Sequence, residues 1–265
     1  RLARPPEDPA PVLSPAGQGL LARGLTVSHG TKVAVREVDL VLPPGRVTAL
    51  MGRNGAGKSS LLWALQGTGR RSAGTVTAAG TDPAAVPSGQ RRALVGLLPQ
   101  NAADLLYLET VAEELAAGDP DGSPGACREL LDRLVPGIGD AAHPRDLSEG
   151  QRLALALALV LAARPGVVLL DEPTRGLDYA AKAELARTLH ALAGEGHAVL
   201  VATHDGEVVA QAADDAVVMA EGEVVSSGPA RRVVVESPAF APQVTKVLGA
   251  PWLRVDEVVA ALEPV

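Results

Sequence analysis

Short runs of apolar and β-branched residues alternate with longer stretches of helical pattern along the chain. The runs that predict strands are 25–28, 32–35, 38–42, 47–51, 95–98, 167–170, 198–203, 216–219 and 223–226. The stretches that predict helices are 58–66, 127–134, 153–163, 180–193 and 255–262. Strands that alternate with helices indicate an α/β fold with a mostly parallel sheet. The strands crowded before residue 51 predict an antiparallel β subdomain beside it.

The most apolar segment, 153–170, is nearly long enough to cross a membrane, because a spanning helix needs about 20 apolar residues. Arg164 would lie in the deeper half of such a helix, where a charge costs about 2.5–3.5 kcal/mol. Pro165 biases the residue before it away from the helical conformation, and Gly166 favours a turn. The segment therefore predicts a buried helix followed by a strand that is buried on both faces, rather than a membrane span.

The two ends of the chain differ from its middle. Residues 1–21 contain five prolines and predict a linker or a disordered arm. We place the main domain at 22–227, with a helical subdomain at about 101–150, and a C-terminal extension at 228–265. The chain begins with Arg1 rather than Met, and we expect it to be part of something longer.

Composition narrows the class of protein. Hydrophobic residues make up 47% of the 265 residues but aromatic residues only 2%, so we expect a sizeable core built of Leu, Val and Ala. The formal net charge of −7 does not favour a nucleic-acid-binding surface. The one cysteine, Cys127, cannot form an internal disulfide and weakly indicates a reducing compartment; we expect it to act as a small buried hydrophobic residue.

A glycine-rich loop lies between the strand at 47–51 and the helix at 58–66. Its sequence, Gly52-Arg53-Asn54-Gly55-Ala56-Gly57-Lys58-Ser59, matches the pattern G-x-x-x-x-G-K-[ST]. In such a loop the backbone amides and the helix dipole attract phosphate oxygens, Lys58 reaches the β- and γ-phosphates, and the Ser59 hydroxyl ligates Mg²⁺. The sequence therefore predicts a site for a nucleoside triphosphate with its magnesium ion.

Two adjacent carboxylates follow the strand at 167–170. Asp171 and Glu172 come at the carboxyl end of a strand, which is the edge where open α/β sheets bind ligands. We expect Asp171 to hold Mg²⁺ through its water shell, and Glu172 to polarise an attacking water as general base. Adjacent carboxylates can also be plain surface charges, but the phosphate loop upstream favours the catalytic interpretation.

The segment Leu147-Ser148-Glu149-Gly150-Gln151 stands directly before the buried helix. It resembles the signature, usually L-S-G-G-Q, of the nucleotide-binding domain of ABC transporters. Further motifs of that family follow the same order: Gln100 matches the Q-loop glutamine, Gly176-Leu177-Asp178 the D-loop, and His204 the switch histidine. The resemblance covers about residues 22–227.

This resemblance implies a P-loop NTPase fold of ABC type and assigns binding roles. His29 falls where the family usually has an aromatic residue that stacks on adenine. The loop positions implied to bind ATP are Asn54, Gly55, Ala56, Gly57, Lys58, Ser59 and Ser60, with Gln100 beyond them. The implied magnesium ligands are Ser59, Gln100 and Asp171.

The resemblance also implies how hydrolysis is organised. Glu172 is the implied base and His204 the sensor of the γ-phosphate. Ser148, Gly150 and Gln151 contact the γ-phosphate bound to a second, homologous ATPase domain, so that two nucleotides are sandwiched between two domains. Ser148 and Gln151 also have the spacing of a helix capping box.

The signature departs from the family pattern at Glu149, which replaces the first glycine of the pair. Two like unit charges about 6 Å apart repel by about 2.8 kcal/mol at an effective dielectric of 20, and the helix dipole offsets about 0.3–1 kcal/mol of this. We therefore hypothesise that Glu149 weakens closure over the ATP of the partner domain, unless its side chain turns away or meets a cation.

A finer resemblance is to the ATPases of energy-coupling-factor importers of vitamins and metals. It rests on the segments 100–106, 110–114 and 171–179, and on the tail at 241–244 and 255–258. It implies a second ABC ATPase domain, often fused in the same chain, a transmembrane coupling subunit and a substrate-binding membrane subunit. The protein would be peripheral on the cytoplasmic face of the cell membrane, and the proline-rich arm fits the C-terminal half of a fused tandem.

Other classes stay open beside this one. A soluble ABC ATPase that acts on ribosomes or nucleic acid would tend to have a basic linker or long heptads, which the net charge of −7 and the stretch before the signature disfavour. An ATPase of another ABC transporter class is a second alternative. A degenerate domain that binds ATP only structurally is a third, and intact Lys58, Asp171, Glu172 and His204 speak against it.

Overall fold

The computed structural model describes residues 19–120, 123–237, 239–250 and 252–262, so the arm predicted at 1–21 lies almost entirely outside the described residues. The larger sheet has, in order across it, β5 (Val95–Leu98), β6 (Val167–Asp171), β7 (Ala198–Ala202), β3 (Val47–Met51), β8 (Asp215–Ala220) and β9 (Glu223–Pro229). Its neighbouring strands are parallel except β8 and β9, which form an antiparallel hairpin. The smaller, antiparallel sheet has β2 (Lys32–Leu42), β1 (Leu20–His29) and β4 (Ala73–Ala78). The predicted α/β fold, with a parallel core and an antiparallel piece, is confirmed.

Strand β2 joins the two runs at 32–35 and 38–42 that the sequence pattern separates. The break between them is a bulge, in which Glu37 has a φ of 45° and its amide donates to the Thr26 hydroxyl over 3.1 Å. The prediction of two strands was wrong because a bulge and a strand end produce the same interruption in the alternating pattern. Strand β4 was not predicted at all.

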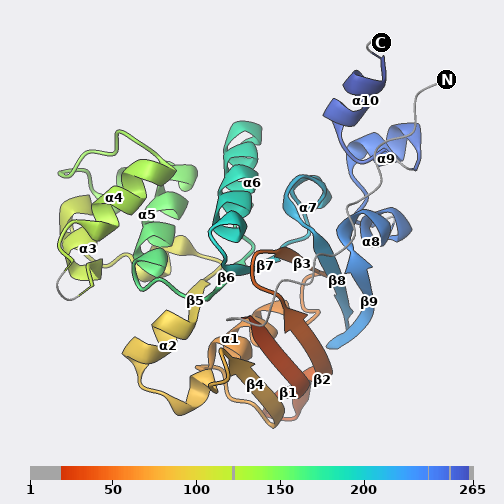
Figure 1. Ribbon diagram of the computed structural model, residues 1–265, viewed down its shortest axis with the longest axis horizontal. Coiled ribbons are helices and arrows are strands. Elements are labelled where there is room, and N and C mark those ends of the chain that lie inside the picture. Colours follow the sequence, from red (N-terminus) through yellow and green to blue (C-terminus); the bar gives the residue numbers. More distant parts are fainter. Residues whose placement is uncertain (1–18, 121–122, 238, 251, 263–265) are drawn as a thin grey trace.

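Helix α1 (Lys58–Gln66) lies between the two sheets and joins their cores (Figure 1). Its residues Leu61, Leu62 and Leu65 are fully buried in one hydrophobic cluster that contains side chains of both sheets. The phosphate loop at the start of α1 is therefore held by packing from two sides.

The other face of the larger sheet is covered by helices. They are α5 (Glu149–Ala162), α6 (Tyr179–Gly194), α7 (Gly206–Ala212) and α8 (Ala230–Glu236). The predicted buried helix is part of α5, and every residue of β6 after it is buried. Within the described ranges no helix is long and apolar enough to cross a membrane, as the break at Pro165 predicted.

Helices α3 (Val111–Gly118) and α4 (Ala126–Leu134) pack with α5 in a hydrophobic cluster of their own. Figure 1 shows this helical region on one side of the molecule, and α8, α9 (Gln243–Leu248) and α10 (Val255–Leu262) on the opposite side. A short helix, α2 (Ser88–Leu94), precedes β5.

Cys127 is buried in the helical cluster. Burial, and after it the hydrogen bond and charge of Asp119, raise the pKa of its thiol to about 12. Its expected role as a small buried hydrophobic residue is confirmed.

The C-terminal helices are tied to the body of the protein through Glu257 of α10. Its buried carboxylate pairs with Arg231 of α8 and accepts from the backbone amide of Leu253 over 3.0 Å. Trp252, at the start of the same turn, is only 7% exposed.

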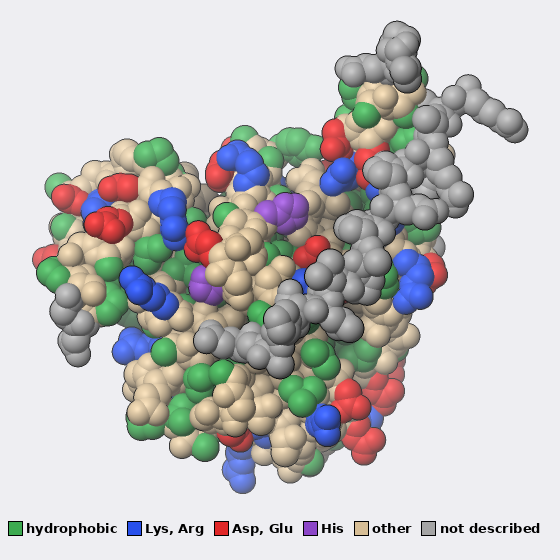
Figure 2. Space-filling view, viewed as in Figure 1, with side chains coloured by type: hydrophobic (Ala, Val, Ile, Leu, Met, Phe, Trp, Pro, Cys, Tyr) green, Lys and Arg blue, Asp and Glu red, His purple; other side chains and the backbone are tan. Residues whose placement is uncertain are grey.

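On the face shown in Figure 2, Lys and Arg side chains are scattered among Asp and Glu side chains rather than gathered in one patch.

Candidate functional site

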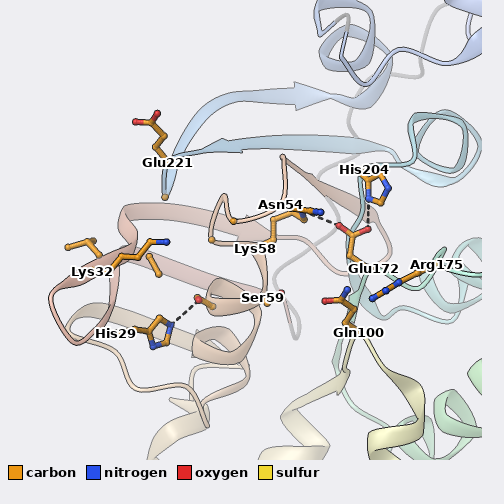
Figure 3. A pocket seen from close by; sticks show the side chains of 16 residues that line it. His29, Lys32, Asn54, Lys58, Ser59, Gln100, Glu172, Arg175, His204 and Glu221 are labelled. Carbon is orange, nitrogen blue, oxygen red and sulfur yellow. Dashed lines mark hydrogen bonds and ion pairs between the residues drawn. The ribbon is translucent and has the colours of Figure 1, made fainter.

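A cavity of about 1000 Å³ opens where the loop after β3 meets the carboxyl ends of β5 and β6. It is lined by His29, Lys32, Val33, Ala34, Asn54, Gly55, Gly57, Lys58, Ser59, Ser60, Gln100, Glu172, Arg175, His204, Glu221 and Gly222 (Figure 3). The loops after β3, β5, β6 and β7 meet here because parallel strands place their following loops at one edge of the sheet. The turns of the antiparallel pairs β1–β2 and β8–β9 supply the remaining lining residues.

The N-terminus of α1 opens into this cavity without an internal cap. Its N-cap residue Gly57 has a φ of 103°, and no side chain of the described chain caps the helix. A Cβ on Gly57 would lie 2.2 Å from the carbonyl oxygen of Ala34, so only glycine fits. Because no acidic side chain stands in the first turn, the amides and the dipole are left for an external anion.

Three ionisable side chains form a connected network on the floor of the cavity. The buried Lys58 ammonium donates to the carbonyl of Gly52 over 2.8 Å and lies 3.1 Å from Oε1 of Glu172. The other carboxylate oxygen of Glu172 lies 2.8 Å from Nδ1 of His204, whose ring is well exposed. Glu172 has a φ of 48°, and its amide donates to the carbonyl of Ala202. A left-handed backbone costs a non-glycine residue about 1–3 kcal/mol, so it persists only where the surroundings fix it.

Asp171 is buried directly below this network. Burial raises the pKa of its carboxyl, the neighbouring Glu172 charge adds to this, and a hydrogen bond from Ser59 and the charge of Lys58 oppose it. Its Oδ1 atom has no hydrogen-bond partner among the described residues. A buried carboxylate oxygen without a donor, next to a serine hydroxyl, suits a bound cation.

The donor set also suits magnesium in particular. No group of three or more His, Cys, Asp or Glu side chains with metal-binding geometry occurs in the part of the chain that is described. A magnesium ion that arrives with a nucleotide needs only one or two protein ligands, because phosphates and waters fill the rest of its shell. Ser59 and Asp171 therefore fit such an ion.

The two ends of the cavity carry different residues. His29 stands at one end, where its Nε2 lies 3.0 Å from the Ser60 hydroxyl. Gln100 stands at the other end, beside Glu172 and His204 (Figure 3).

The signature residues lie elsewhere. Ser148, Gly150 and Gln151 form the first turn of α5 and line a smaller cavity of about 210 Å³ against α6. The amide of Gln151 donates to the Ser148 hydroxyl over 3.2 Å, and the amide of Ser148 donates to the Gln151 side chain over 3.0 Å. The predicted capping box is confirmed. One chain thus does not bring its signature to its own phosphate loop.

The Glu149 side chain forms an ion pair with Arg152. Its carboxylate lies 2.6 Å from Nη1 of Arg152, and its side chain is 56% exposed. The same guanidinium donates to the carbonyl oxygens of Pro144, Arg145 and Leu147. Arg152 therefore both compensates the Glu149 charge and braces the loop that leads into α5.

Sequence reasoning missed three polar residues of the nucleotide cavity, Lys32, Arg175 and Glu221. Arg175 could have been considered, because it stands three residues after Glu172 and before the D-loop. Lys32 and Glu221 come from the tips of two hairpins, and no motif marks either of them.

The ABC transporter family matches residues 35–175 of this chain. A protein of Streptomyces coelicolor, described as an ABC transporter ATP-binding protein, is 54% identical over 266 residues, which cover 99% of this chain and 46% of that protein. The nickel import ATP-binding protein NikO of Rhodobacter capsulatus is 37% identical over 229 residues, which cover 80% of this chain and 89% of that protein. The solved structure of cbiO1 from Clostridium perfringens, part of the ABC transporter complex cbiONQ, aligns at 26% identity with a TM-score of 0.72, over 87% of this chain and 96% of that one.

The chain spans about half the length of the Streptomyces relative. The family match takes in more than half of the chain, and NikO is aligned over most of its own length. With the phosphate loop, the carboxylates after β6 and the fold in agreement, the chain belongs to the ATP-binding proteins of the ABC transporter family, whose domains bind and hydrolyse ATP.

Proposed function

We propose that this chain is one of two ATPase domains that together power import across a cell membrane, in a complex of energy-coupling-factor type. The observation that carries the proposal is the network of Lys58, Glu172 and His204 on the floor of the cavity. The names of NikO and cbiO1, proteins of nickel import and of the cbiONQ complex, support the import class.

Within this network Glu172 acts as the general base. A water held by its carboxylate attacks the γ-phosphorus, and the bond from phosphorus to the β–γ bridging oxygen breaks. ADP leaves with that oxygen, and the proton of the water passes to Glu172. His204 lies 2.8 Å from the Glu172 carboxylate and orients it, and the same histidine contacts the γ-phosphate. A phosphate next to Lys58 competes with Glu172 for the ammonium and so frees the base.

The remaining binding roles follow the shape of the cavity. The amides of residues 54–60 hold the phosphates, and His29 stacks on adenine at the end of the cavity opposite Gln100. Ser59, Gln100 and Asp171 hold Mg²⁺. When bound, this ion neutralises charge on the β- and γ-phosphates.

A second ATPase domain completes each site. Ser148, Gly150 and Gln151 lie outside the cavity of their own chain, so they are available to the γ-phosphate of a partner domain. The relatives that are about twice as long support a partner domain fused in the same polypeptide.

The transmembrane coupling subunit would dock in a groove of about 550 Å³ between α1, β5 and the helical region. Three large side chains on this groove are exposed although apolar or aromatic: Trp63 at 41%, Tyr107 at 80% and Leu108 at 39%. An exposed apolar groove of this kind fits a protein partner. The chain would thus work at the cytoplasmic face of the cell membrane, with a substrate-binding membrane subunit in the same complex.

We propose the same three parts, an arm, an ATPase domain and a C-terminal extension, but with the domain beginning at Leu20, where β1 begins, and ending at Pro229, where β9 ends, instead of at 22 and 227. The separate hydrophobic cluster of α3 and α4 supports a helical subdomain at about 101–150, although Leu155 and Ala158 of α5 also belong to that cluster.

Isothermal titration of MgATP tests the core of the proposal. Lys58→Ala should weaken binding by about 10- to 100-fold, since hydrogen bonds to charged groups contribute about 1.5–3 kcal/mol. Lys246→Ala, on α9 far from the cavity, is the matched control. Equal affinities of wild type and Lys58→Ala would refute the assignment of the site.

Co-purification tests the biological setting. Recovery of the full-length protein with membranes and an integral membrane protein supports transport. Recovery with ribosomes instead would favour a soluble ABC ATPase.

A further inference from the structure

Two cations on the wall of the nucleotide cavity have no partner within the described residues, Lys32 and Arg175. Lys58, by contrast, is buried and paired with Glu172. Figure 3 shows that Lys32 and Arg175 stand at opposite ends, Lys32 near His29 and Arg175 beside Gln100 and Glu172. Among the described residues that line the catalytic end of the cavity, the cation without a side-chain partner is therefore Arg175.

The backbone holds Arg175 at a fixed place relative to the general base. Its amide donates to the carbonyl of Glu172 over 3.2 Å, which closes a tight turn after β6. The residue before it, Thr174, is buried, and its hydroxyl lies 3.1 Å from that of Thr203, the neighbour of His204. Arg175 thus leaves the sheet from a turn that is anchored to both β6 and the end of β7.

The side chain points from this turn toward Gln100, across the entrance to the floor where Glu172 and His204 meet (Figure 3). An arginine offers two parallel N–H groups in the geometry that phosphate oxygens accept, and it keeps its charge at any working pH. The Glu172 carboxylate close by already has Lys58 and His204 as partners. A phosphate delivered to this end of the cavity would be the anion best placed to engage the guanidinium.

We infer that Arg175 is a further phosphate-binding residue of the ATPase site, whose guanidinium donates to oxygens of the γ-phosphate. This rests on the proposed function, since it requires ATP in the cavity. As the bond to the bridging oxygen breaks, charge on the γ-phosphate oxygens redistributes, and a fixed cation beside them lowers the barrier. Arg175 comes from the same chain as Glu172, unlike the signature residues.

The test compares ATP with ADP, because only ATP carries the γ-phosphate. All proteins carry Glu172→Gln to prevent turnover, and binding is measured by titration of the full chain. Arg175→Gln should weaken MgATP by about 10- to 100-fold and leave MgADP unchanged. Arg133→Gln, which removes a charge from an exposed ion pair with Glu195 on another face, should change neither affinity.

Turnover in the assembled complex gives the second readout. With Glu172 intact, Arg175→Gln should lower kcat by about 10²-fold or more, and Arg175→Lys should restore part of it by keeping the charge but not the paired donors. Equal loss of ATP and ADP affinity, or loss of neither, overturns the inference. So does a variant that binds ATP normally but no longer joins its partner domain. If the wild-type chain and Lys58→Ala bind ATP equally, the proposed function fails, and the inference falls with it.

Discussion

Helices α1 and α5 both begin at positions proposed to face a phosphate, and their first turns are built in opposite ways. Helix α1 has Gly57 as its N-cap, has no side-chain cap or acidic residue in its first turn, and opens into the large cavity. Helix α5 has Ser148 as its N-cap, has a closed capping box with Gln151, and carries Glu149 in its first turn.

The difference lies in what the chain leaves for a ligand. The first turn of α1 keeps its amides for an external anion, so the phosphate loop binds with partners of its own chain. The first turn of α5 already has hydrogen-bond partners within its own chain, so it is ordered without a ligand. To bind a phosphate, it must share these hydrogen bonds with the phosphate or exchange them for new ones. The α5 end therefore suits a contact that forms and breaks, whereas the α1 end suits a bound nucleotide.

The largest expected effect belongs to the α1 side. Glu172→Gln should lower turnover at this phosphate loop by about 10²–10⁴, because a positioned base is lost while the charge-binding loop stays intact. The measurement is phosphate release from the assembled complex, with ATP binding checked by titration. Unchanged release from this site would mean that the base lies elsewhere.

Exchanging the two caps tests the comparison directly. Gly57→Ser gives α1 the cap residue of α5. The Cβ of the new serine would lie 2.2 Å from the Ala34 carbonyl oxygen, at a φ of 103°, so we expect a loss of stability. The free energy of unfolding should fall by at least about 2 kcal/mol. The reverse change, Ser148→Gly, should cost only about a few tenths of a kcal/mol. Urea unfolding measures both, and equal losses would break the comparison.

A smaller effect concerns the charge at the start of α5. Because Arg152 compensates Glu149, Glu149→Gln should change ATP-driven dimerisation by less than about fivefold. Arg152→Gln should weaken it by about tenfold, since it leaves the carboxylate facing the partner's phosphate. If charge is the cause, adding Glu149→Gln to Arg152→Gln restores dimerisation. No rescue would show instead that Arg152 acts by bracing the loop through its carbonyl contacts.

The smallest effect is the pH dependence of the α1 side. The pKa of Asp171 is raised by burial, so between its ordinary value and the raised one the folded state holds more protons than the unfolded state. This contribution to stability is present at low pH and is lost as pH rises through that window. Asp171→Asn should remove this contribution, so that the melting temperature measured without magnesium depends less on pH above about pH 4. The exposed Asp132→Asn is the control, and a profile for Asp171→Asn that matches wild type would contradict the prediction.

The nucleotide cavity could be anticipated from sequence where its residues stand in contiguous motifs. The phosphate loop, Glu172 and His204 lie where strand ends place them, and the strand ends follow from apolar runs. Arg175 could not be placed, because a turn residue points into a cavity or into solvent according to backbone details that no pattern encodes.

The fold shows the same limit. Helix α2 buries none of its side chains, so it leaves no apolar period to detect, and α7 has only seven residues. The pairing of Glu149 with Arg152 had the spacing of neighbours on a helix, yet only the structure shows that the same guanidinium is also committed to three carbonyl groups.

The two tryptophans of the chain stand in contrasting surroundings, Trp63 half exposed beside the groove next to α1 and Trp252 buried in the C-terminal turn. Their intrinsic fluorescence therefore separates two events without any label. A protein that covers the groove excludes water from Trp63 and moves its emission to shorter wavelength, while loosening of the C-terminal helices exposes Trp252 and moves its emission the other way. With so few aromatic residues elsewhere, the spectrum of this protein reads these two places almost alone.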